Sequence, residues 1–191
     1  MQYAQTSSNL WSFVLSAPDA NSYIAIGFSS NGVMIGSSAV VGWISATDGS
    51  PTVKKYFLGG QNSKEVVLDG GNLVINTSMI VTQSSRLYLA FQLNTDQPAP
   101  RIIYALGPTG VMPSSPSFSL TRHADMVSTT LNYVTGKNRQ AIWLILFFSC
   151  IICVKYLLIN IVQCALVHEP FVNTTWLVLL SICQEHAIFL T

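Results

Sequence analysis

The clearest structural signal in the chain is the stretch Arg86-Leu87-Tyr88-Leu89-Ala90-Phe91-Gln92-Leu93-Asn94. Its side chains alternate between a set suited to a core (Leu87, Leu89, Phe91 and Leu93) and a set suited to the opposite face (Tyr88, Ala90, Gln92 and Asn94). Successive side chains of a β-strand point to opposite faces, so this period of two predicts a strand that covers a core with one face.

Short apolar runs of the same kind lie on both sides of this stretch. We expect strands at Leu10–Leu15, Tyr23–Phe28, Ala39–Ser45, Thr52–Phe57, Glu65–Leu68, Leu73–Asn76, Arg101–Leu106 and Thr129–Val134. Turn-forming groups such as Asp48-Gly49-Ser50-Pro51 and Asp69-Gly70-Gly71-Asn72 separate them. Roughly nine strands at this spacing, with no amphipathic helical pattern before residue 140, predict an all-β sandwich or barrel.

Composition divides the chain into two parts. The whole chain is 50% hydrophobic and 9% charged with a net charge of +1, which provides no basic surface for nucleic acid. Of the 17 charged side chains, 14 precede residue 141, whereas all four cysteines follow it. We therefore expect a β-domain over residues 1–136, a short linker over 137–140 and a hydrophobic tail over 141–191.

The tail has the length of a membrane segment. Residues 141–167 carry one charge, Lys155, and about 20 apolar residues are enough to cross a bilayer. A lysine in mid-span costs about 2.5–3.5 kcal/mol on insertion, which the surrounding Leu, Ile and Phe offset. A transmembrane helix is therefore expected here, and Phe171–Cys183 is expected to be interfacial or to form half of a hairpin. Cys150 and Cys153, despite their Cys-x-x-Cys spacing, are interpreted as apolar filler of this tail.

Hydrolytic and phosphate-binding chemistry have no support in the sequence. His123 is the only histidine before residue 168, and a Ser-His-Asp triad would need it together with its near neighbour Asp125. No Gly-x-Ser-x-Gly elbow, phosphate-binding loop or zinc spacing occurs. Two glycosylation sequons, Asn76-Thr77-Ser78 and Asn173-Thr174-Thr175, have meaning if their segments reach the secretory lumen.

A late histidine and an early methionine form the candidate site. His123 precedes the last expected strand, and Met34 lies between Gly32 and Gly36, whose lack of a side chain lets backbone approach a flat macrocycle. A thioether and an imidazole are a known axial pair of haem iron, which raises its potential and leaves no open position for oxygen chemistry. Taken alone, each residue has a structural alternative: methionine is a common core filler, and Met79, Met112 and Met126 compete with Met34.

Several segments in order resemble the DOMON domain, most closely that of plant cytochrome b-561 and DOMON domain-containing proteins. They are Tyr23-Ile24-Ala25-Ile26-Gly27-Phe28-Ser29, Met34-Ile35-Gly36-Ser37, Tyr56-Phe57-Leu58-Gly59-Gly60, Arg86–Leu93, Ile103-Tyr104-Ala105-Leu106-Gly107-Pro108, Arg122-His123-Ala124-Asp125 and Thr129–Gly136. The resemblance implies an immunoglobulin-like β-sandwich that holds one noncovalent haem b. It also implies Met34 and His123 as the axial ligands of the haem iron.

The resemblance further implies what such a domain does. It would be a membrane-tethered electron carrier, not a turnover enzyme, that is reduced by ascorbate or a redox protein and lies on the extracellular or lumenal side. The family's full-length members carry a signal peptide and a six-helix b-561 core, whereas no signal peptide is visible here and the tail lacks the core's paired histidines. A truncated, nonfunctional product is therefore one alternative. Lys137 and Arg139 also favour the opposite orientation by the positive-inside rule.

The other alternative is a haem-free sandwich that binds carbohydrate or a protein partner at the cell surface. Trp11, Tyr23 and Trp43 would form its sugar platform, unless they are core residues. Arg122 beside His123 would pair with a haem propionate or lie in solvent.

Overall fold

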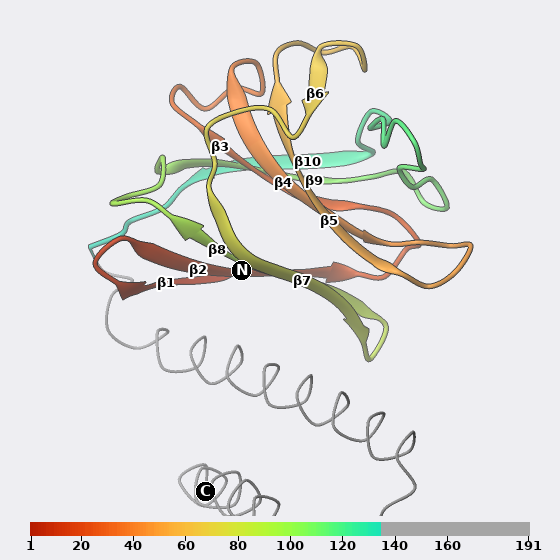
Figure 1. Ribbon diagram of the computed structural model, residues 1–191, viewed down its shortest axis with the longest axis horizontal. Coiled ribbons are helices and arrows are strands. Elements are labelled where there is room, and N and C mark those ends of the chain that lie inside the picture. Colours follow the sequence, from red (N-terminus) through yellow and green to blue (C-terminus); the bar gives the residue numbers. More distant parts are fainter. Residues whose placement is uncertain (135–191) are drawn as a thin grey trace, which may run out of the picture. The chain divides into compact units, whose positions relative to one another are not determined.

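The computed structural model describes residues 1–134, which form ten strands and no helix. Four strands form one antiparallel sheet in the order β1-β2-β8-β7: β1 Gln2–Ser7, β2 Leu10–Pro18, β8 Arg86–Asn94 and β7 Ile75–Gln83. Six form the second in the order β10-β9-β3-β4-β5-β6: β10 Asp125–Thr130, β9 Arg101–Leu106, β3 Ile24–Ser29, β4 Ser37–Ile44, β5 Pro51–Leu58 and β6 Val66–Leu68. The two sheets lie face to face, which confirms the predicted sandwich (Figure 1).

The core between the sheets follows the alternation of β8. Leu87, Leu89, Phe91 and Leu93 are at most 3% exposed and pack with apolar residues of β2, β3, β4 and β9. Phe13 of β2 stacks on Phe91 of the same sheet at 5.2 Å, and its T-shaped contact with Phe28 of β3 at 5.2 Å links the two sheets. We call this cluster the inner core.

A second apolar cluster covers the other face of the six-stranded sheet. Residues that alternate with inner-core positions in β3, β4 and β5 form it: Tyr23, Ala25, Ala39, Val41, Trp43, Tyr56 and Leu58. All seven are at most 8% exposed, so this face is covered as well. We call it the outer cluster. Because its sheet is buried on both faces, β3 and β4 are almost wholly apolar or small, without the polar alternation of a half-exposed strand.

Three expectations about strands were wrong. β1 had not been expected at all, and β7 runs to Gln83, well beyond the expected end at Asn76. The last strand was expected at Thr129–Val134, but β10 pairs with β9 from Asp125 to Thr130. Leu131 and Tyr133 give the expected strand its apolar character because they pack on the inner core after β10 has ended.

The expected tail lies outside the described residues. This includes the linker over 137–140, the membrane segments over 141–191 and the sequon at Asn173. Within residues 1–134, no helix has the length and apolar character of a membrane span.

Candidate functional site

The two predicted site residues lie at opposite ends of the outer cluster. Met34 follows β3 and precedes β4, and its partly buried side chain packs on this cluster. His123 is half-buried and precedes β10 at the end of the sheet where β3 begins. The two residues are thus separated along β3, whose six residues span about 17 Å at ~3.3 Å per residue.

Hydrogen bonds hold the loop that carries Met34. The Ser29 hydroxyl donates to the Val33 carbonyl at 2.8 Å and accepts from the Gly32 amide at 2.8 Å. The Ser37 hydroxyl also donates to the Val33 carbonyl, at 2.7 Å, and the Gly36 amide donates to the Leu58 carbonyl at 2.8 Å. Gly36 has a φ of +84°, a conformation that favours glycine, so this residue allows the sharp return into β4.

Residues 107–123, which we call the covering segment, carry His123 across the outer cluster. Met112, Phe118 and Leu120 of this segment pack on the cluster, so three apolar side chains cover the sheet. The Ala124 amide then donates to the Leu106 carbonyl at 2.8 Å and starts the pairing of β10 with β9.

Two buried tyrosines attach the covering segment to the sheet. The Tyr23 hydroxyl donates to the Thr121 carbonyl at 2.7 Å, two residues before His123, and the Tyr56 hydroxyl donates to the Phe118 carbonyl at 2.7 Å. Burial raises the pKa of Tyr23 to about 12. Burial also raises the pKa of Tyr56, with smaller contributions from the Asp69 carboxylate and Tyr23. Both phenols therefore stay protonated and able to donate at neutral pH.

The floor beneath the covering segment is made of small residues. Ala25 and Gly27 of β3 lie beside Ala39 of β4 and Ala105 of β9, to which they are paired in register. A Cβ added at Gly27 would meet Ile103 and Leu58 at 3.7–3.8 Å, which is ordinary contact. This part of the sheet surface thus carries short apolar side chains and is surrounded by larger ones.

The residue types at the two ends of β3 are those of a b-type haem site. Met34 packs on the outer cluster and His123 lies beside the other end of β3, so in this structure the two residues stand about the length of that strand apart. A thioether and an imidazole are ligands that hold haem iron without covalent attachment of the macrocycle. Low floor residues and an apolar cover provide the dry surroundings such a group requires.

The competing methionines have different positions. Met79 pairs with Ala90 on the four-stranded sheet, on the face away from the inner core, so it lies on the opposite side of the sandwich from the outer cluster. Met126 is 47% exposed on β10. Met112 packs on the same outer cluster as Met34 and remains its competitor.

The expected sugar-binding platform of exposed aromatic side chains is not present, and that prediction was wrong. Trp11 and Trp43 are each 1% exposed and Tyr23 is 4% exposed, so none of them presents a ring to solvent. Trp11 packs in the inner core, where its ring meets the edge of Tyr133 at 4.6 Å. Arg122 is exposed beside His123.

Sequence reasoning missed the two tyrosine attachments. The Tyr23 and Tyr56 hydroxyls reach carbonyls 98 and 62 residues away in the chain, so nothing local marks them. Their only signal was their place in the apolar runs Tyr23–Phe28 and Thr52–Phe57.

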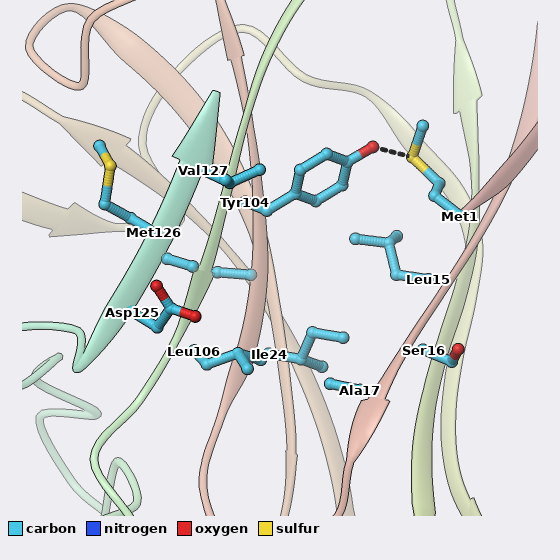
Figure 2. A pocket seen from close by; sticks show the side chains of 12 residues that line it. Met1, Leu15, Ser16, Ala17, Ile24, Tyr104, Leu106, Asp125, Met126 and Val127 are labelled. Carbon is cyan, nitrogen blue, oxygen red and sulfur yellow. Dashed lines mark hydrogen bonds between the residues drawn. The ribbon is translucent and has the colours of Figure 1, made fainter. Parts of the chain in front are cut away.

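A separate cleft of about 320 Å³ opens between the sheets near β10 and the start of β1 (Figure 2). Leu15 and Ala17 line one side and Leu106 and Val127 the other, while the Tyr104 hydroxyl donates to the Met1 sulfur across it. Neither Met34 nor His123 lines this cleft. Within residues 1–134, no group of three or more His, Cys, Asp or Glu side chains is arranged to hold a metal ion.

Comparison with known proteins gives two plant relatives. Both are Arabidopsis thaliana proteins named cytochrome b561 and DOMON domain-containing protein. One is 53% identical over 140 residues, covering 72% of this chain and 38% of the relative. The other is 31% identical over 144 residues, covering 74% of this chain and 36% of the relative. The chain thus spans less than two fifths of the length of either relative.

Among solved structures, the cytochrome domain of Myriococcum thermophilum cellobiose dehydrogenase is similar, with a TM-score of 0.46 and 14% identity over 66% of this chain and 68% of that one. No family model matches the sequence.

Proposed function

Over 72% of its length the chain is a homologue of a cytochrome b561 and DOMON domain-containing protein, and from this premise we propose that it is a haem b electron carrier. Met34 and His123 would be the axial ligands. The haem would supply a reversible one-electron couple, while the protein supplies ligands, orientation and exclusion of water.

The observation that carries this proposal is the outer cluster itself. It is a buried apolar face with a methionine packed at one end and a half-buried histidine beside the other. In an ordinary sandwich the inner faces of the two sheets form the core and the outward-facing residues are polar, so a second buried apolar face is an additional feature of this chain.

The chain's own residues would perform three tasks. The hydrogen-bonded loop from Ser29 to Ser37 would hold the Met34 sulfur in place. Tyr23 and Tyr56 would keep the covering segment, and with it His123, close to the sheet. Met112, Phe118 and Leu120 would exclude water from the face.

Partners and location are part of the same proposal. The relatives' name includes cytochrome b561, which supports a membrane setting for an electron carrier. We propose that residues 141–167 tether the chain to a membrane and that the sandwich lies on its extracellular or lumenal side. Ascorbate or a redox protein would supply the electron.

The test is a visible absorption spectrum of the full chain, expressed with haem available and recorded before and after ascorbate is added. We expect a sharp low-spin Soret band with separate α and β bands after reduction. A folded but colourless protein would overturn the proposal.

Ligand variants then assign the iron's partners. Met34→Ala should lose the low-spin reduced spectrum and His123→Ala should lose most of the bound haem, whereas Met79→Ala, on the opposite side of the sandwich, should change neither. Met112→Ala separates the two methionines of the outer cluster. If Met112→Ala loses the low-spin spectrum and Met34→Ala keeps it, the methionine assignment is wrong.

A further inference from the structure

The sequon Asn76-Thr77-Ser78 lies at the start of β7, on the side of the sandwich away from the outer cluster. Among the described strands β7 is the outermost of its sheet and pairs only with β8. The pairing shifts register between Ile75 and Thr77, so Asn76 is the extra residue of a β-bulge and has no partner position on β8.

The Asn76 side chain is available for modification. Asn76, Thr77 and Ser78 are all exposed, and the one hydrogen bond of the Asn76 amide group runs from Nδ2 to Gln92 Oε1 at 3.2 Å. An asparagine amide carries two N–H groups, so replacing one of them by a sugar leaves the other to donate to Gln92. The fold can therefore carry a substituent on Nδ2 without losing this contact.

We propose that Asn76 is an N-glycosylation site of the folded domain. In the modification, a bond forms between Asn76 Nδ2 and the anomeric carbon of an oligosaccharide. The bond from that carbon to the diphosphate of a lipid-linked donor breaks, the diphosphate leaves with the electron pair, and Nδ2 loses one proton. No oxidant or reductant is involved.

A glycan here would also protect the molecule. A free edge strand presents unpaired backbone groups that can pair with another chain. A large hydrophilic group at the bulge of β7 would keep a second sheet from approaching that edge. The covering segment, on the side of the other sheet, would remain accessible to a redox partner.

The test uses the full chain translated with microsomes or expressed in a eukaryotic secretory system, followed by treatment with an N-glycosidase and gel analysis. Asn173→Gln is present in every variant, so that any glycan detected is attached to a sequon in the described domain. Asn76→Gln removes that sequon. A matched control, Asn76→Gln with Lys64→Thr, creates a new sequon at the exposed loop residue Asn62.

We expect a glycosidase-sensitive shift of one glycan that disappears in Asn76→Gln and returns in the control. No shift in the parent chain overturns the proposal, and the control then gives the reason. A shift in the control alone means that Asn76 is rejected although the domain is lumenal; no shift in either means that the domain does not reach the lumen. The haem spectrum of Asn76→Gln should equal that of the parent, so failure here is distinguishable from failure of the proposed function.

Discussion

At the level of single residues, the two phenol groups beneath the covering segment link the sheet to the candidate ligand. Each donates to a carbonyl that has left the regular strand pairing, at Phe118 and at Thr121. Thr121 is exposed and Phe118 is half-buried, so water can reach these carbonyls and each bond contributes the net free energy of an ordinary hydrogen bond. Throughout the described residues, no buried side-chain nitrogen or oxygen lacks a hydrogen-bond partner.

Removing either hydroxyl should loosen the covering segment. Tyr23→Phe and Tyr56→Phe are each expected to lower the free energy of unfolding by about 0.5–1.5 kcal/mol, because one hydrogen bond is lost while the ring stays in place. Urea unfolding followed by tryptophan fluorescence measures this change. Tyr88→Phe on the four-stranded sheet is the control and should stay within ~0.5 kcal/mol, as is usual for substitutions away from such features.

The hydrogen bonds of these two tyrosines lie at different distances along the chain from His123. The bond of Tyr23 lies two residues from His123 and that of Tyr56 lies five residues away. With haem bound, Tyr23→Phe should therefore change the reduction potential more than Tyr56→Phe does. Equal potentials in both variants and the parent would mean that neither tyrosine positions the ligand.

At the level of elements, the sequence predicts strands whose side chains alternate and misses those defined by pairing. β8 and β9 begin and end where the pattern predicts, at Arg86–Asn94 and Arg101–Leu106. β10 is exposed at all six positions, so no apolar period marks it; only its pairing with β9 makes it a strand. β7 has one fully buried residue, Ile80, and β1 has one, Ala4.

The two candidate ligands could be proposed from the sequence, whereas the packing around them could not. Met34 and His123 stand out because a lone histidine and a methionine between glycines are unusual in the sequence. The cover over the outer cluster was not predictable, since it depends on a segment with three prolines that packs through Met112, Phe118 and Leu120. Packing between residues far apart in the chain leaves no periodic pattern in the sequence.

The one fully buried side chain of β7 tests whether this edge strand belongs to the core. Ile80 is 2% exposed and packs in the inner core. Ile80→Ala should therefore lower the free energy of unfolding by about 2–5 kcal/mol through lost burial and the cavity left behind. Val74→Ala, at a residue that is 58% exposed just before β7, is the control. A loss below ~0.5 kcal/mol for Ile80→Ala would mean that β7 is not packed as described.

The end of β9 fits closely against the ring of Tyr23. A Cβ added at Gly107 would lie 2.5–3.0 Å from three ring atoms of Tyr23, and a buried ring cannot bend away as a flexible chain does. Gly107→Ala should cost about 1–3 kcal/mol by overpacking and should displace the Tyr23 hydroxyl from Thr121.

Gly27→Ala is the matched control for Gly107→Ala, because its added Cβ meets neighbours only at 3.7–3.8 Å. Thermal unfolding of both variants gives the comparison. If Gly27→Ala destabilises the domain as much as Gly107→Ala does, the close approach to Tyr23 is not the cause.

For the molecule as a whole, burial on both faces of the six-stranded sheet gives a specific dependence on alkaline pH. Four tyrosines around the two clusters have a raised pKa, chiefly because of burial: Tyr23, Tyr56, Tyr104 and Tyr133. For Tyr23 and Tyr104 the pKa rises from 10.0 to about 12. In the unfolded chain these phenols lose their protons near pH 10, whereas in the folded protein they keep them.

The sign of the effect follows from proton binding. Between pH 10 and about 12 the folded state holds more phenol protons than the unfolded state, so the free energy of unfolding must fall as the pH rises. Well below pH 10 both states are protonated, and these four groups contribute no slope. Urea unfolding at several pH values from 8 to above 11 should show a plateau followed by a steep loss of stability.

The same experiment on Tyr23→Phe separates proton linkage from general alkaline damage. This variant should start with a lower free energy of unfolding at pH 8, because Thr121 loses its donor, yet lose less stability above pH 10, because one titrating phenol is gone. The two curves should therefore converge as the pH rises. Parallel curves would mean that the Tyr23 phenol is not held protonated by the fold, and its attachment of the covering segment would then need another explanation.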